Sequence, residues 1–159
     1  MTTLANSASL DRLDRRLAAW MAKFGPYLAR YALAIVFIWF GALKVPRLSS
    51  ADDLIQRTVY WFDPDWFIPF LGVWEVLIGV CLLWRPLIRV GLPLLFLQMP
   101  GTFLPLILLP QVCFEQVPLV PTLEGQYIMK NLVLIAAAIA AGGTVRATVC
   151  QPASMDLKS

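Results

Sequence analysis

Seven polar side chains lie inside or at the ends of apolar runs that are long enough to cross a membrane. The clearest is Glu75, which lies near the middle of its run. An ionisable group at the centre of a bilayer costs about 2.5–3.5 kcal/mol, so it usually faces other helices and has a partner. As a group, these side chains could bind a carbonyl group or an anion. The predicted pocket residues are Lys44, Glu75, Gln98, Thr102, Tyr127, Lys130 and Asn131.

The spacing of small residues around these side chains predicts which helix faces point inward. Gly72 and Gly79 lie three residues before and four residues after Glu75, on the same helical face. Small residues let another helix approach closely. In the next apolar run, Gln98 and Thr102 are four residues apart and share a face in the same way. Both faces are therefore predicted to line the interior of a helix bundle.

Two lysines are candidate partners of Glu75, and the sequence ranks them. Lys130 begins the inward face of the last apolar run and is the natural partner. Lys44 can instead extend toward the lipid headgroups, so it ranks below Lys130. Three interpretations of the polar group remain open: a satisfied network that fixes helix packing, a pocket open toward the outer leaflet, or a proton-coupled pathway.

The elements that must position these side chains follow from composition. The chain has 159 residues, of which 59% are hydrophobic, whereas about 45–50% is usual for a soluble domain. Apolar runs at about 27–44, 67–84, 88–109 and 126–143 are each long enough to span a bilayer as a helix. The sequence predicts an all-α integral membrane four-helix bundle in one domain, 27–143, in contact with the lipid bilayer.

The segment before the first span has a different pattern. Between Leu10 and Phe24, apolar residues recur at helical spacing and basic residues fill the other face. This pattern predicts an amphipathic interfacial helix within a cytoplasmic segment, 1–26, that ends at Gly25 and Pro26. A solvated helix packed on a partner protein is the alternative.

The distribution of Lys and Arg predicts the orientation in the membrane. Nine basic residues lie before the first span, between the second and third spans, or in the tail, and three lie in the first connection. The positive-inside rule therefore places both termini, including the tail 144–159, in the cytoplasm and the protein in the cell inner (plasma) membrane. The nine are Arg12, Arg15, Arg16, Lys23, Arg30, Arg85, Arg89, Arg146 and Lys158.

Several chemistries lack their usual residues. The chain has no histidine, the common ligand of b-type haem, zinc and non-haem iron, and no C-x-x-C pair for thiol exchange. We expect no metal site and no intrinsic cofactor. The basic residues flank apolar runs rather than forming one solvated face, so a nucleic-acid partner is not expected. Cys113 is predicted to be an unpaired thiol in the outer loop.

Three stretches of the chain form a recognisable set of motifs: Ala32 to Lys44 (ALAIVFIWFGALK), Leu71 to Gly79 (LGVWEVLIG) and Met129 to Leu134 (MKNLVL). In sequence and order they resemble the DoxX-like membrane proteins, particularly the YkgB-type branch associated with reactive-chlorine resistance. The resemblance covers about 27–143, and Lys44, Glu75 and Lys130 match motif positions. It implies a four-helix membrane bundle and a quinone-linked or oxidative-stress-related membrane subunit, with a quinone as the candidate ligand and another membrane protein or redox subunit as partner.

Two other functions are compatible with the sequence. A structural or assembly subunit without catalytic activity would use the amphipathic helix and the small-residue faces to bind another membrane protein. A small transporter is less well supported, since no inverted repeat is evident. Whether the chain is part of an enzyme, and which residues would then be catalytic, is left open by the sequence.

Overall fold

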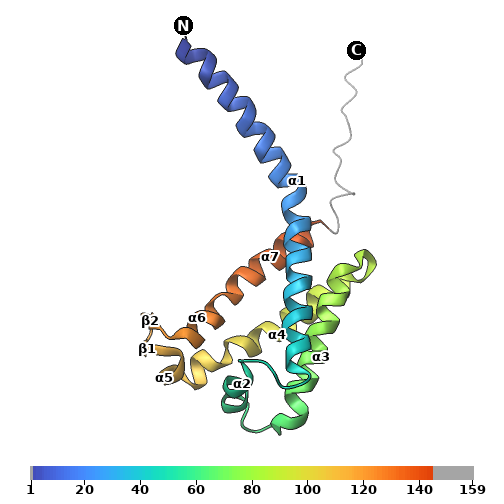
Figure 1. Cartoon of the computed structure of the whole chain (residues 1–159), viewed down its shortest axis with the longest axis vertical. Helices are drawn as coiled ribbons and strands as arrows, with labels where there is room; N and C mark the ends of the chain where they lie inside the picture. The colour runs from blue at the N-terminus through green and yellow to red at the C-terminus, as the bar shows by residue number, and fades with distance from the viewer. Residues whose placement is uncertain (1, 145–159) are drawn as a thin grey trace, which may run out of the picture.

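A computed structural model describes residues 2–144, with side chains from Leu10 onward. The predicted tail, 144–159, therefore lies outside the described residues except for Thr144. The fold is helical apart from one small hairpin (Figure 1). Its elements are α1 (Thr2–Lys44), α2 (Asp52–Thr58), α3 (Pro64–Leu83), η1 (Arg85–Leu87), α4 (Ile88–Leu108), α5 (Pro110–Cys113), β1 (Phe114–Gln116), β2 (Val120–Pro121), α6 (Leu123–Met129) and α7 (Asn131–Gly143).

Four helical segments are long and apolar enough to cross a membrane: Leu10–Lys44, Pro64–Leu83, Arg85–Leu108 and Leu123–Gly143. The prediction of an all-α four-helix membrane bundle is confirmed, and the chain is a membrane protein. Large apolar side chains stay exposed along these segments, which suits contact with lipid rather than water. They include Ile35, Trp39, Leu97, Ile107, Val133 and Ile139.

The predicted end of the N-terminal helix at Gly25 and Pro26 is wrong, because α1 continues through both residues into the first span. Proline removes one backbone donor and bends a helix, but it does not force the helix to end when the flanking turns are apolar and helical. Figure 1 shows the result: the first part of α1, which we call the arm (residues 2–25), projects at an angle from the bundle.

The closest packing in the bundle is between α1 and α3, which we call the α1–α3 seam. A Cβ atom added to Gly41 would lie 2.6 Å from the carbonyl oxygen of Gly72, and one added to Gly72 would lie 2.7 Å from that of Gly41. A Cβ added to Gly79 would lie 2.8 Å from the carbonyl oxygen of Ala34. The prediction that Gly72 and Gly79 admit a neighbouring helix is therefore confirmed.

The apolar core lies in the half of the bundle nearest the arm, where α4 and α7 join α1 and α3. Its members are aliphatic or aromatic, and this half holds the helices together by apolar burial and close packing. The core residues are Leu33, Ala34, Phe37, Ile78, Leu82, Leu95, Met99 and Ala138. The half farther from the arm contains the polar residues predicted to form a pocket.

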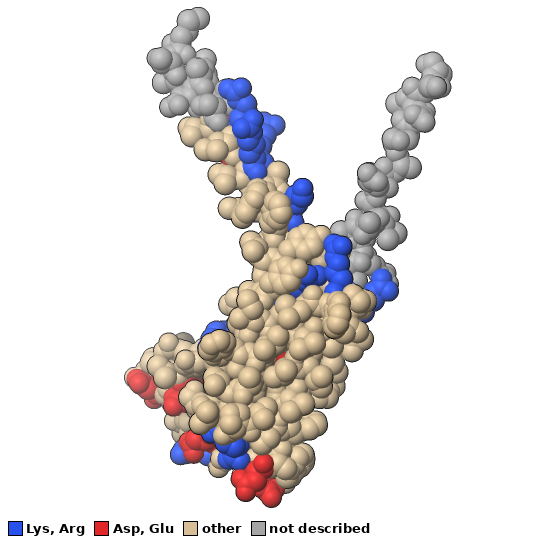
Figure 2. Space-filling view, turned by 45° about the vertical axis from the view of Figure 1, so that its right-hand side comes forward, with Lys and Arg blue, Asp and Glu red and all other residues tan. Residues whose placement is uncertain are grey.

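Charge divides the surface into three zones (Figure 2). Lys and Arg lie along the arm and at the adjoining end of the bundle, whereas Asp and Glu gather at the opposite end with a smaller number of basic residues. Between the two ends the face in view is mostly uncharged, with a small basic spot at its left edge and a small acidic spot near its centre. This order of zones is typical of a protein that crosses a bilayer.

A candidate ligand-binding cavity

All seven predicted pocket residues line one cavity of about 300 Å³ in the half of the bundle farther from the arm. Its walls come from α1, α2, α3, α4, α6 and α7, and apolar side chains such as Phe37, Leu71 and Met99 form most of them. The sequence thus identified residues that the fold brings together. That this cavity binds a ligand remains a prediction.

A buried ion pair and an amide form one side of the cavity. Lys44 Nζ lies 2.6 Å from Glu75 Oε2, and Gln98 Nε2 donates a hydrogen bond of 2.7 Å to Glu75 Oε1. Lys44 is 7% exposed and Glu75 is 8% exposed. Both carboxylate oxygens therefore have a donor, which compensates for the removal of the charge from water.

The ranking of Lys130 above Lys44 as the partner of Glu75 is wrong. The seam explains why: a Cβ on Gly72 would lie only 2.9 Å from the Cβ of Lys44, so the close approach of α1 to α3 brings Lys44 next to the turn that carries Glu75. Sequence spacing places residues on a helix face, but it does not determine which neighbouring helix comes closest.

Lys130 instead lines the cavity from the turn between α6 and α7. Its Nζ is 3.6 Å from the centroid of the Tyr127 ring and 5.8 Å from that of Phe40, which are cation–π contacts. Within residues 2–144, no carboxylate forms an ion pair with Lys130. Its N–H groups remain able to donate to a ligand in the cavity.

Gln98 supplies the complementary group, a buried acceptor. Its Nε2 donates to Glu75, but its Oε1 is buried and has no hydrogen-bond partner among residues 2–144. A buried amide oxygen without a partner costs about 1–3 kcal/mol. The cavity thus has an ammonium donor on one side and an unused acceptor on another.

The two remaining predicted residues complete the lining. Thr102 is on α4, and its hydroxyl donates to the carbonyl of Met99 at 2.7 Å. Asn131 lines the cavity from the first turn of α7. Neighbouring Gly101 also faces the cavity, and a Cβ there would meet nothing within 4 Å.

The short helix α2 closes the cavity at its end, and the sequence analysis missed it. Leu54, Ile55 and Thr58 on α2 all line the cavity. A signal was present, since Asp53 and Arg57 are four residues apart and form an ion pair of 2.9 Å along α2. Two acidic residues at the start of the segment also suit a helix N-terminus.

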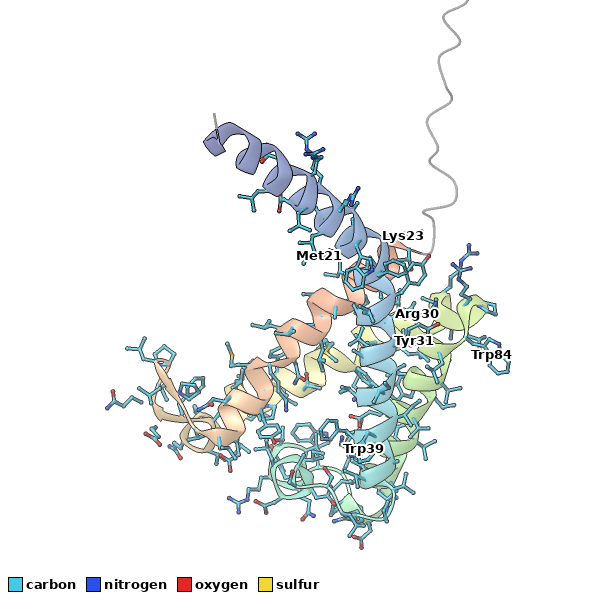
Figure 3. The ribbon with its side chains drawn as sticks, turned by 45° about the horizontal axis from the view of Figure 1, so that its top comes forward. Met21, Lys23, Arg30, Tyr31, Trp39 and Trp84 are labelled. Carbon is cyan, nitrogen blue, oxygen red and sulfur yellow. The ribbon has the colours of Figure 1, made fainter. Side chains whose placement is uncertain are left out.

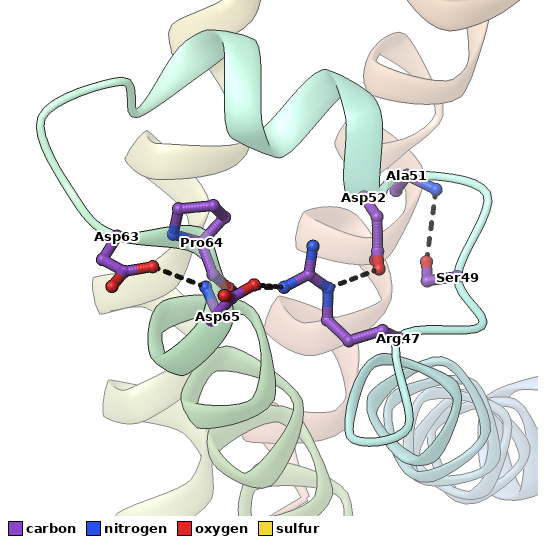
Figure 4. Close-up of polar contacts among 7 residues, drawn as sticks. All are labelled: Arg47, Ser49, Ala51, Asp52, Asp63, Pro64 and Asp65. Carbon is purple, nitrogen blue, oxygen red and sulfur yellow. Dashed lines mark hydrogen bonds and ion pairs between the residues drawn. The ribbon is translucent and has the colours of Figure 1, made fainter.

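Arg47 holds α2 against the start of α3 (Figure 4). Its Nε donates to Asp52 Oδ2 at 3.1 Å, and its Nη1 donates to the carbonyl of Pro64 at 2.9 Å and to Asp65 Oδ1 at 3.0 Å. Arg47 has a φ of 60°, an uncommon conformation for a residue with a side chain. Its three contacts compensate for this conformation and connect the two helices.

Cys113 lies outside the cavity, at the end of α5, and is fully buried. It is unpaired within the described part of the chain, as is Cys81. Burial raises the pKa of the Cys113 thiol above its ordinary value, and the negative charge of Glu124 raises it further. The backbone of Gly125 packs directly on the Cys113 carbonyl, so this corner is tight.

Among residues 2–144, no group of three His, Cys, Asp or Glu side chains could hold a metal ion.

No protein-family model matches the chain, and no curated protein or solved structure is similar to it. Its function is therefore argued from the cavity and the surface.

Proposed function

We propose that the chain is an inner-membrane subunit that binds a quinone in the cavity and acts with a separate redox partner. The observation that carries the proposal is the cavity: its walls are apolar, and it contains an ammonium donor on Lys130 and an unused acceptor on Gln98. A lipophilic ring with oxygen substituents suits this combination, because carbonyl oxygens require donors and hydroxyl groups require an acceptor.

The size and position of the cavity favour a ligand that arrives through the lipid. At about 300 Å³ it is at the lower end of the range for small-molecule sites, about 300–1,000 Å³, and suits one substituted ring rather than a long chain. Phe40, Tyr127 and Lys130 line it and are also exposed on the surface. A long apolar tail could leave the cavity at this edge.

The chain's own part in this function is to bind and orient the ligand. A bound quinone supplies two-electron, two-proton chemistry, and the electrons would come from the redox partner. The buried Lys44–Glu75 pair would keep its geometry throughout, whereas Lys130 and Gln98 would contact the ligand. Membership of the DoxX-like family, in the YkgB-type branch, belongs to this proposal and rests on the three motifs quoted above.

The proposed orientation has both termini in the cytoplasm of a cell with an inner membrane. The surface supports this, since the arm and its adjoining end carry most of the basic residues (Figure 2). The cavity then opens near the outer leaflet. A reporter fused after Arg16 should be cytoplasmic and one fused at Glu115 external. The opposite result would refute the orientation without affecting the ligand.

The test of the ligand is direct binding. Protein purified in a mild detergent should retain quinone detectable by mass spectrometry of the extract, and it should bind decyl-ubiquinone in a calorimetric titration. Gln98→Leu and Lys130→Met should each lower this affinity about tenfold, since each removes one polar contact to the ligand. Gln126→Leu and Lys23→Met are matched controls, because neither residue lines the cavity.

Three outcomes would refute the quinone proposal. They are an extract without quinone together with no binding of the analogue, equal binding by Gln98→Leu and Gln126→Leu, or equal binding by Lys130→Met and Lys23→Met. Thermal unfolding of each variant in detergent distinguishes lost binding from lost folding.

A second function, that of an assembly subunit, is favoured by the arm. Apolar side chains on the arm are exposed, including Leu13, Leu17 and Met21. Such a stripe can lie on the membrane surface or bind a partner helix. Removal of residues 2–20 should release a copurifying membrane protein if the arm binds a partner, and should leave quinone binding unchanged.

A further inference from the structure

Two guanidinium groups meet one tyrosine ring at the end of the bundle nearest the arm, far from the cavity. The Cζ atom of Arg30 lies 6.0 Å from the centroid of Tyr27, and that of Arg85 lies 5.9 Å from the same centroid. Arg85 Nη2 also donates to the Tyr27 hydroxyl at 3.3 Å, and Arg30 stacks on Tyr31 at 4.5 Å. Two positive charges thus share a small aromatic cluster drawn from α1 and η1.

The charge of this cluster has no counterion among residues 2–144. Arg30 is only 3% exposed, and its Nε is buried without a hydrogen-bond partner in the described part of the chain. No carboxylate in the described part of the chain forms an ion pair with Arg30 or Arg85. Aromatic faces stabilise a guanidinium only in part, so a buried arginine with a free donor favours an anion beside it.

The position of the cluster indicates which anion is at hand. Arg30 and Tyr31 lie where α1 enters the bundle, at the same end as Trp84, with Lys23 farther up the arm (Figure 3). Trp84 is 67% exposed. Exposed Trp and Tyr at the end of a span are typical of the depth at which lipid headgroups lie. The planar fork of arginine matches the oxygens of a phosphate group, and two arginines can share one group.

We propose that Arg30 and Arg85 form a binding site for a phosphate group, supplied by the headgroup of an anionic phospholipid. Inorganic phosphate in the aqueous phase has the same chemistry and is the alternative source. The site is independent of the quinone proposal, since none of its residues lines the cavity. Its function would be to fix the depth and orientation of α1, from which the arm projects.

The test uses full-length protein in a mild detergent, titrated with phosphatidylglycerol, phosphatidylcholine or inorganic phosphate. Native mass spectrometry measures bound lipid, and thermal unfolding measures stabilisation. Phosphatidylglycerol should bind and raise the Tm well above the effect of phosphatidylcholine, whose choline cation opposes the arginines. Arg30→Gln and Arg85→Gln should each weaken phosphatidylglycerol binding about tenfold, the effect of one charge-assisted contact. Arg30→Lys should also weaken it, because an ammonium lacks the fork.

Arg89→Gln is the matched control, since Arg89 is exposed on the adjoining turn and contacts neither tyrosine in the described structure. It should change the binding by less than about twofold, as expected for a screened surface charge. Equal losses in Arg89→Gln and Arg30→Gln would overturn the site, because binding would then follow net charge alone. If inorganic phosphate raised the Tm as much as phosphatidylglycerol does, the lipid headgroup would be excluded as the source of the phosphate group.

A folding readout distinguishes a binding site from a structural arginine. Arg30→Gln removes an uncompensated buried charge, so its Tm without anionic lipid should equal or exceed that of the unmodified protein, while the gain from phosphatidylglycerol is lost. A lower Tm without lipid combined with an unchanged lipid gain would overturn the proposal. Asp156 lies outside the described residues, and Asp156→Asn should leave lipid binding unchanged. Stronger lipid binding in that variant would show that the chain's own carboxylate competes for the site, and would also overturn it.

Discussion

The α1–α3 seam and the α4 wall of the cavity both use glycine, with opposite results. At the seam, Gly41 and Gly72 bring two backbones so close that a Cβ on either would collide with the other's carbonyl. On the wall, Gly101 has nothing within 4 Å of the same position. Small residues therefore have two uses in this bundle: they allow contact between helices at the seam, and they leave space on the wall.

The charged residues differ in the same way between the two sides. Lys44 and Glu75 form a closed pair at the seam, and both are buried. Lys130, at the turn between α6 and α7, contacts the rings of Phe40 and Tyr127, forms no ion pair with a carboxylate of residues 2–144, and is exposed. The seam has the features of a structural contact, and the part of the cavity next to Lys130 has those of a ligand site.

The largest effect is expected from breaking the closed pair. Lys44→Met leaves Glu75 buried without its cation and should lower the free energy of unfolding by about 3–5 kcal/mol, and Glu75→Gln should have a similar effect. The double variant should recover much of this loss, because no uncompensated charge remains. The measurement is equilibrium unfolding in mixed detergent micelles.

Lys130→Met is the control for the two single variants and the double variant. Lys130 is exposed and unpaired by carboxylates in the described residues, so its removal should cost less than about 1 kcal/mol. If the double variant lost as much stability as the two single variants together, the closed pair would not be the structural element we describe. A larger loss in Lys130→Met than in Lys44→Met would show the same.

The next largest effect is a direct comparison of glycines. Gly41→Ala forces a Cβ to within 2.6 Å of the Gly72 carbonyl oxygen, so the helices must separate, at a cost of about 1–3 kcal/mol. Gly101→Ala adds a methyl group in open space within a helix and should stabilise by up to about 1 kcal/mol. The two variants should thus shift the thermal unfolding midpoint in opposite directions. A shift of the same sign would remove the contrast between seam and wall.

A smaller effect is expected where α2 closes the cavity. Arg47→Gln removes the contacts to Asp52, Pro64 and Asp65, and should destabilise by about 1 kcal/mol, because Arg47 and Asp65 are partly or largely exposed. It should also speed release of a bound quinone analogue in a stopped-flow measurement, since α2 is then held less firmly. Arg57→Gln breaks only an exposed pair within α2 and should change neither quantity. Equal release rates in both variants would exclude α2 as the closing element.

Much of the architecture could be predicted from the sequence because lipid limits the choices to apolar helices of sufficient length. The inward faces of α3 and α4 followed from spacing alone, and Glu75, Gln98 and Thr102 on these faces line the cavity. The partner of Glu75 could not be obtained in this way, since it depends on how closely Gly41 and Gly72 let two helices approach. The continuation of α1 past Pro26 was missed because a proline permits a bend as well as an end.

Contacts between segments distant in the chain also could not be predicted from the sequence. Nothing in the spacing places Arg85 beside Tyr27, 58 residues earlier, or Arg47 beside Asp65, 18 residues later. These contacts form only when helix ends meet in space. Arg47 and Arg85, which the sequence analysis did not assign to a contact, lie at such ends, whereas Glu75, Gln98 and Thr102 within helices were identified by their periodicity.

The smallest expected effect concerns Cys113, which lies at the end of α5 where Gly125 packs closely on its carbonyl. Burial, followed by the charge of Glu124, raises the pKa of its thiol, and only the thiolate reacts with maleimides. Alkylation by a membrane-impermeant maleimide on intact cells should therefore be slower than for a free cysteine near neutral pH and should keep rising at pH values above the ordinary thiol pKa. Glu124→Gln removes the secondary cause and should speed the reaction by less than about threefold, because Glu124 is exposed and its charge is screened.

The sign of the accompanying stability change follows from the same pKa. A thiol whose pKa is higher in the folded state stabilises the fold below the unfolded-state pKa, and this contribution is lost as the pH rises toward the folded-state value. Burial of Cys113 thus predicts a small loss of stability at alkaline pH that Cys113→Ala should abolish. Alkylation at neutral pH at the rate of a free thiol would show that the packing around Cys113 opens readily. The tight packing of Gly125 on Cys113 argues against this, because α6 would have to separate from α5 before the reagent could reach the sulfur.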